Sequence, residues 1–262
     1  MRRLESVGES VSMRTDQDAE AIWLLPNADL SLPRHEVHVW RAPLDQPQSL
    51  TAFLATLAPD EQERAARFHF QKDREHFIAA RGLLRAILGR YLNVRPADLS
   101  FGYSAYGKPF LVSEQGGEVR FNVSHSHGLA LFAFAQGRDL GIDLEQMRPE
   151  VAEEQIAERF FSSCEVAALR ALPAGQHTEA FFNCWTRKEA YIKARGEGLS
   201  LPLDQFDVSL APGEPAALLH TAMAADDASR WSMIELAPGA SYKAALVVEG
   251  GGWQLRCWQW PG

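Results

Sequence analysis

The chain has 262 residues, of which 46% are hydrophobic and 23% are charged, a composition typical of a globular protein with a substantial core. Its 26 basic and 34 acidic side chains give a net charge of −8, so the overall field does not favour nucleic acid or an anionic membrane as a partner. Any anionic ligand must therefore bind in a local basic pocket.

The cysteines and the N-terminus indicate the cellular compartment. Cys164, Cys184 and Cys257 show no C-x-x-C spacing, which argues against a disulfide framework or a zinc site. Residues 1–33 lack the apolar region of a secretory signal, and no apolar stretch elsewhere approaches the ~20 residues that cross a bilayer. We expect a cytoplasmic protein with no membrane partner and a partly disordered N-terminal extension at 1–33.

Hydrophobic periodicity predicts strands and helices in chain order. A helix should begin at Pro59, because proline and acidic residues suit a first helical turn. The earlier part of the chain has a predicted strand at 36–40, a long helix at 72–91, an irregular segment at 101–110, and strands at 119–123, 129–135 and 140–145. The later part has predicted helices at 151–160, 163–171 and 178–194, and then strands at 231–236, 242–248 and 253–260 that should close a second sheet.

Two acidic residues stand two positions apart in the predicted strand at 140–145. The period of a strand places Asp143 and Glu145 on one face, with Ile142 and Leu144 on the other. Neighbouring carboxylates repel each other unless a cation joins them, and hard oxygen ligands suit Mg²⁺. A solvated strand edge explains the pair equally well, so both interpretations stay open.

The predicted helix at 178–194 carries a second group. Trp185, Glu189 and Lys193 are four residues apart and share one face. A glutamate followed four positions later by a lysine is also the favoured order for an ordinary surface ion pair. The large Trp185 on the same ridge favours a packed face instead.

A third group lies at 121–127, where Phe-Asn-Val-Ser-His-Ser-His ends a predicted strand, preceded by Tyr-Gly-Lys-Pro at 106–109. Hydroxyl, imidazole and ammonium groups can all donate to phosphate oxygens. A structural role for His125, or a transition-metal site formed by His125 and His127 beside the acid pair, remains an alternative. A Ser–His hydrolase is disfavoured because no G-x-S-x-G elbow accompanies Ser124 or Ser126.

The ordered combination of these motifs resembles the phosphopantetheinyl transferases of the surfactin-synthetase-activating type. The matching segments are Tyr-Gly-Lys-Pro at 106–109, Phe-Asn-Val-Ser-His-Ser at 121–126, Gly-Ile-Asp-Leu-Glu at 141–145 and Trp-Thr-Arg-Lys-Glu-Ala-Tyr-Ile-Lys at 185–193. The similarity runs from Pro59 to Phe206 and includes Ala-Arg-Gly-Leu-Leu-Arg at 80–85 and Gly-Leu-Ser-Leu-Pro-Leu at 198–203.

The resemblance implies an α+β monomer of two similar α/β halves, at 34–147 and 148–262, with the active site in the cleft between them. It also implies a magnesium-dependent enzyme, with Mn²⁺ as a possible substitute. The implied reaction moves the 4′-phosphopantetheine group of coenzyme A to a serine hydroxyl of an apo acyl or peptidyl carrier protein. Adenosine 3′,5′-bisphosphate is released.

The resemblance also assigns residues. The implied metal ligands are Asp143, Glu145 and Glu189, and the implied catalytic residues are Glu189, Lys193 and Asp143. The implied coenzyme A contacts are Arg74, Arg81, Lys108, Ser124, His125 and Lys193. Where some relatives have two lysines that reach a coenzyme A phosphate, this chain has Glu61 and Arg64, so part of that contact must differ.

Two alternatives of other classes stay open. One is a coenzyme A-binding or carrier-docking protein without turnover. The other is a magnesium-dependent nucleotide hydrolase, which would consume coenzyme A with no carrier present. The motifs leave open which carboxylate is the general base, what residues 1–33 do, and whether the carriers belong to fatty-acid, polyketide or peptide synthases.

Overall fold

The computed structural model describes residues 22–27, 30–112, 117–148, 153–222 and 227–261. The part of the predicted N-terminal extension at 1–21 lies outside these ranges, as do residues 151–152 of the helix expected at 151–160. Within the described ranges no helix is both long and apolar enough to cross a membrane.

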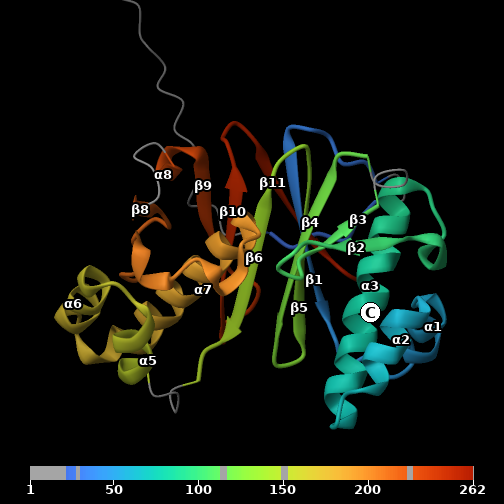
Figure 1. Ribbon diagram of the computed structural model, residues 1–262, viewed down its shortest axis with the longest axis horizontal. Helices are drawn as coiled ribbons and strands as arrows, with labels where there is room; N and C mark the ends of the chain where they lie inside the picture. Colours follow the sequence, from blue (N-terminus) through green and yellow to red (C-terminus); the bar gives the residue numbers. More distant parts are fainter. Residues whose placement is uncertain (1–21, 28–29, 113–116, 149–152, 223–226, 262) are drawn as a thin grey trace, which may run out of the picture.

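The described residues form two main sheets, of four and three strands, and two two-stranded ribbons, with helices on the outer sides of the main sheets (Figure 1). In the first half the elements are β1 (Glu36–Pro43), α1 (Leu50–Thr56), α2 (Pro59–Ala66), α3 (Gln71–Leu92), β2 (Phe101–Tyr103), β3 (Pro109–Leu111), β4 (Val119–Ser126) and β5 (Leu129–Gln136). In the second they are β6 (Leu140–Gln146), α5 (Glu153–Phe160), α6 (Ser163–Ala171), α7 (His177–Arg195), β7 (Phe206–Val208), β8 (Leu218–Thr221), α8 (Asp227–Arg230), β9 (Trp231–Leu236), β10 (Tyr242–Glu249) and β11 (Gln254–Gln259).

The two halves repeat one topology. Each has a strand, a long helix, a two-stranded ribbon and an antiparallel strand pair, which gives the sheet orders β1-β5-β4 and β6-β10-β9. The expected fold of two similar α/β halves is therefore confirmed. The predicted boundary at 147 would leave β6 in the first half. In the topology, however, β6 is the first strand of the second repeat, as β1 is the first strand of the first repeat.

Three apolar layers hold these elements together. Trp40, Phe132 and Phe134 on one face of the first sheet pack in a core with α3. Ala245 and Val247 on the outer face of the second sheet pack in a core with α7. The inner faces of the two sheets meet in a third core of Val39, Leu131, Ala133, Ile142, Leu144 and Leu246. The order of layers is helix, sheet, sheet, helix, because the central strands β5 and β10 bury apolar side chains on both faces.

Two expectations from the sequence are wrong. The segment at 101–110 is not irregular throughout, because β2 and β3 pair across a turn in which Gly107 has a φ of 80°. These strands have three residues each, too few for an alternating pattern to be recognised. The last strand does not join the second sheet: β11 pairs in parallel with β1 in the first sheet.

Candidate functional site

A close approach between α7 and β6 builds the site. A Cβ atom at Gly141 would lie 2.1 Å from the carbonyl oxygen of Ala190 and 2.2 Å from the amide nitrogen of Ala194, so only glycine allows this contact. The approach sets one ridge of α7 against β6. Glu189 and Lys193 consequently lie beside the acid pair of β6.

These side chains line a pocket to which both halves contribute. Its lining consists of Val123, Ser124, His125, Asp143, Glu145, Phe160, Trp185, Glu189, Lys193 and Leu203. The strand alternation holds, because Ile142 and Leu144 are in the core between the sheets while the two acids face the pocket. The ridge of Trp185, Glu189 and Lys193 also faces it, as the spacing of four residues predicts.

Asp143 is the most buried acid of the pocket, with 3% of its surface exposed. Its Oδ1 atom accepts hydrogen bonds from the Nζ of Lys193 at 2.6 Å and the Oγ of Ser124 at 2.9 Å. Its Oδ2 atom is buried and has no hydrogen-bond partner. A buried carboxylate oxygen without a partner is costly, and this one is available to a ligand or a cation.

Burial and crowding shift the pKa values of the other two acids, Glu145 and Glu189. Burial, and then the charge of Asp143, raise the pKa of Glu145 and of Glu189 above the usual carboxyl value. Lys193 opposes both shifts, and a hydrogen bond from Ser126 opposes that of Glu145. Three acids and one lysine therefore share the pocket, and the excess of negative charge favours a cation there.

The acids are not assembled as a metal centre. Within the described ranges, no three His, Cys, Asp or Glu side chains form a group that could hold a metal ion. This applies to Asp143, Glu145 and Glu189, and equally to a site that would include His125 and His127. The chemistry of the donors nevertheless suits a hard cation, because all three are carboxylates and one oxygen of Asp143 lacks a partner.

The surface ion pair considered for Glu189 and Lys193 is not present. Lys193 bonds to Asp143, and in the described part of the chain no ion pair joins it to Glu189. The neighbouring Lys188 points away from the pocket: it is fully buried, lies 2.7 Å from an oxygen of Glu165, and donates to the carbonyl of Phe206 at 2.5 Å. Within the segment at 185–193, Lys188 therefore holds buried structure together, whereas Lys193 faces the pocket and bonds to Asp143.

Lys108 lines a second pocket with Tyr106, Asn122, Ile192 and others, and this pocket shares Glu189 and Lys193 with the first. Its Nζ donates to the carbonyls of Leu140, Lys193 and Ala194 at 3.0, 2.6 and 3.4 Å. Burial lowers the pKa of Lys108 to about 8, so the ammonium form still predominates at pH 7. All three ammonium protons of Lys108 are therefore used in hydrogen bonds to carbonyls at the end of α7 and the start of β6.

His125 keeps an exposed surface at the rim of the first pocket. Partial burial, and then the charges of Lys193 and His76, lower its pKa. The imidazole is therefore mainly neutral at pH 7 and gains a proton most easily when an anion binds beside it.

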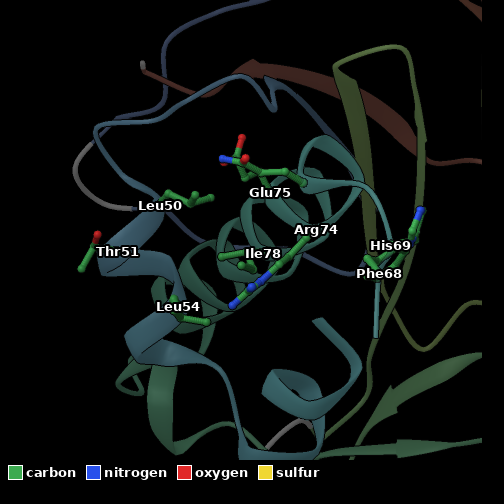
Figure 2. Close-up of a pocket in the computed structure, with 9 residues that line it drawn as sticks. Leu50, Thr51, Leu54, Phe68, His69, Arg74, Glu75 and Ile78 are labelled. Atoms are coloured by element: carbon green, nitrogen blue, oxygen red, sulfur yellow. The ribbon is translucent and has the colours of Figure 1, made fainter. Parts of the chain in front are cut away.

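The two predicted arginines, Arg74 and Arg81, do not line the pockets that share Glu189. Arg81 is 9% exposed and bonds to Glu61 and, at 2.8 Å, to the hydroxyl of Tyr103. Arg74 lines a separate groove between α1 and the first turns of α3 (Figure 2), together with Leu50, Leu54 and Ile78.

Glu61 explains the departure from relatives noted in the sequence. It is 2% exposed, and one of its oxygens lies 2.7 Å from the guanidinium of Arg85. The same oxygen accepts the amide proton of Ala58 at 2.8 Å and so caps α2. Glu61 is an internal counter-charge for two arginines of α3, a position that a lysine could not fill.

Sequence reasoning gave no role to Phe160 and Leu203, which form apolar walls of the first pocket. No local signal marked Phe160, because it looks like an ordinary core residue, and Leu203 was noted only as the end of the motif at 198–203. Asn122 and Ser126 were within a quoted motif but received no role. Their pairing with β6 becomes visible only when the two halves are packed together.

The sequence also matches known protein families and proteins. The sequence model of the 4′-phosphopantetheinyl transferase superfamily matches residues 139–247, and that of the N-terminal region of 4′-phosphopantetheinyl transferases matches residues 39–136. The chain is 45% identical to the 4′-phosphopantetheinyl transferase HetI of Nostoc sp. over 91% of this chain and 98% of that protein. It is 34% identical to the 4′-phosphopantetheinyl transferase Sfp of Bacillus subtilis over 64% of this chain and 72% of that protein. With both halves matched in order, the chain belongs to the 4′-phosphopantetheinyl transferase family.

Proposed function

We propose that this transferase takes the 4′-phosphopantetheine group from coenzyme A and attaches it to a serine hydroxyl of an apo acyl or peptidyl carrier protein. The observation that carries the proposal is the buried Oδ2 of Asp143, which has no partner and lies in a pocket with two further acids and Lys193. Both halves of one chain line this pocket, which supports a monomer as the working unit.

Asp143, Glu145 and Glu189 are the proposed ligands of Mg²⁺, with Mn²⁺ as a possible substitute. The orphaned oxygen of Asp143 and the raised pKa values of Glu145 and Glu189 support this set, because a divalent cation would relieve the repulsion among them. When bound, the cation would supply positive charge to the pyrophosphate of coenzyme A.

Lys193 and Glu189 are the proposed catalytic pair, with Asp143 holding Lys193. The ammonium of Lys193 has a fixed direction because it lies 2.6 Å from Asp143 and 3.1 Å from the hydroxyl of Ser124. From this position it can donate to the phosphate oxygen on which negative charge grows as the leaving group departs. The raised pKa of Glu189 brings this carboxylate closer to what a general base for the carrier serine requires.

His125 is the proposed contact to a phosphate of coenzyme A, because it is exposed at the pocket rim and neutral before the anion binds. Ser124 acts mainly on Asp143, since its hydroxyl donates to that carboxylate. Lys108 and Arg81 are left out of the proposed contacts, because Lys108 donates to three backbone carbonyls and the nearly buried Arg81 bonds to Glu61 and to the hydroxyl of Tyr103. Their predicted role as coenzyme A contacts is untested. Arg74, on the separate groove, is left out as well.

A single incubation tests the proposed function. The protein is mixed with coenzyme A, Mg²⁺ and a panel of apo carrier proteins, and each carrier is weighed by intact-mass spectrometry. We expect a phosphopantetheine increment on at least one carrier. Coenzyme A binding without any increment would favour a non-catalytic protein, and coenzyme A consumption without a carrier would favour a nucleotide hydrolase.

Glu189→Gln separates the proposed roles of Glu189 in the same assay. Glutamine keeps the shape but removes the charge, so transfer should fall by about 10²- to 10³-fold. Rescue by excess Mg²⁺ would identify Glu189 as a metal ligand above all, whereas a defect that persists at saturating Mg²⁺ would identify a role in proton transfer. A fully active variant would exclude both.

A further inference from the structure

Strands β1 and β6 are equivalent, but the backbone groups on their outer edges find different hydrogen-bond partners. The edge of β1 that faces away from β5 pairs with β11 along a regular backbone ladder. The edge of β6 that faces away from β10 meets side chains of β4. Asn122 Oδ1 accepts the amide of Ile142 at 2.9 Å, and the hydroxyls of Ser124 and Ser126 accept the amides of Leu144 and Gln146 at 3.2 Å each.

These three bonds form a regular series, because each joins residues 20 positions apart. Alternate side chains of β4 thus take the place of backbone carbonyls along the edge of β6. The series satisfies buried amides that would otherwise have no acceptor. It also fixes the register between the two halves at the line where the first pocket opens.

The two serines make a second bond that the asparagine does not. Ser124 donates to Oδ1 of Asp143 at 2.9 Å, and Ser126 donates to Oε2 of Glu145 at 2.9 Å. A serine hydroxyl has one proton and two lone pairs. The hydroxyl of Ser126 accepts the amide of Gln146 and also lies 3.1 Å from Nδ1 of His127. When that nitrogen carries its ring proton, it fills the second lone pair of the hydroxyl, and the hydroxyl proton goes to the carboxylate of Glu145.

We propose that Ser126 is a positioning residue that aims the carboxylate of Glu145 into the pocket. The bond to Gln146 holds the hydroxyl in place, and the hydroxyl in turn selects one orientation of Glu145. This inference rests on the proposed role of Glu145 as a metal ligand. It predicts that affinity for the divalent cation depends on the line of contact between the two halves.

The test compares Ser126→Ala with Asn122→Ala. Both variants leave one amide of β6 without an acceptor, but only Ser126→Ala also removes a bond to a carboxylate. Binding of Mn²⁺ in the presence of coenzyme A is measured by titration calorimetry, and the melting temperature of each variant is recorded. We expect Ser126→Ala to weaken Mn²⁺ binding by about 10-fold or more, the usual effect of losing a hydrogen bond to a metal ligand. We expect both variants to melt at similarly reduced temperatures, with Mn²⁺ affinity preserved within about 2-fold in Asn122→Ala.

Two further variants complete the experiment. Ser126→Thr keeps the hydroxyl and should restore Mn²⁺ affinity. If Ser126→Ala does not fold, Ser126→Cys is used instead, and the weak thiol donor should give an intermediate affinity. Equal losses of Mn²⁺ affinity in the Ser126 and Asn122 variants, or no loss in the Ser126 variant, would overturn the positioning role. Glu145→Gln distinguishes this from a failure of the metal assignment, because unchanged Mn²⁺ binding in that variant would reject the ligand role of Glu145 itself.

Discussion

The long helices α3 and α7 occupy equivalent places in the two halves, yet one cluster of charged residues on each helix has the opposite surroundings. On α3, Arg81 and Arg85 share Glu61, and Arg85 also donates to the carbonyls of Pro96 and Leu99 at 2.8 and 3.0 Å. On α7, Glu189 and Lys193 face two more acids, and one oxygen of Asp143 has no partner.

The comparison contrasts a cluster of charges that are bonded within the fold with a cluster that has an excess of acids. The donors named on α3 meet acceptors, so that cluster stabilises the packing of α2 and α3. The cluster on α7 has an excess of acids whose pKa values are raised by burial and by one another. Such strain persists where binding or catalysis requires it.

The largest effect is expected from Asp143→Asn, which alters the cluster on α7. Loss of this charge should lower carrier transfer by about 10³-fold, because both the proposed metal site and the anchor of Lys193 are lost. Relief of repulsion with Glu145 and Glu189 offsets the lost ion pair, so the melting temperature should change little. Transfer is followed by intact mass and folding by thermal denaturation. Near-normal turnover in Mg²⁺ would contradict the assignment.

Glu61→Gln should show the reverse pattern, with a large loss of stability and little change in transfer. Removing the shared counter-charge leaves Arg81 and Arg85 buried without compensation, which should lower the free energy of unfolding by about 3 kcal/mol. Transfer per folded molecule should stay near that of the parent protein. Glu63→Gln is the matched control, since Glu63 is in the same helix and forms an exposed pair with Arg67. Equal stability of the two variants in urea would disprove the structural role of Glu61.

An intermediate effect, on stability, is expected from Lys108→Met. His125→Ala is the variant with which it is compared. Removing the ammonium leaves carbonyls at the end of α7 without a donor, which should destabilise the protein by about 1 to 3 kcal/mol. The KM for coenzyme A should change little in this variant. His125→Ala should instead raise that KM with little change in stability. A large rise in KM for Lys108→Met with unchanged stability would restore Lys108 as a coenzyme A contact.

The smallest effect is a pH dependence of the metal-free protein. Glu145 and Glu189 have pKa values raised by burial, so the folded state binds protons more tightly than the unfolded state. Stability should therefore fall as pH rises from the usual carboxyl pKa through the raised values. Metal binding needs the ionised forms and should strengthen over the same interval. Melting temperatures across this range, with and without Mg²⁺, check both trends, and Glu189→Gln should flatten them.

Local patterns in the sequence determined most elements and the direction of the key side chains. The alternation in β6 placed Asp143 and Glu145 on one face, and the spacing of Trp185, Glu189 and Lys193 placed them on one ridge of α7. These predictions succeed because strand and helix periods depend only on neighbours along the chain.

Only the tertiary structure decided which partner each of these groups meets. The sequence did not indicate that β11 returns to β1, that Lys108 holds the end of α7, that Glu61 joins two arginines, or that Ser126 bonds to Glu145. Each of these contacts joins residues distant in the chain. Their formation depends on how the two halves pack, since a side chain bonds to whatever the fold brings within reach and no local period encodes that choice.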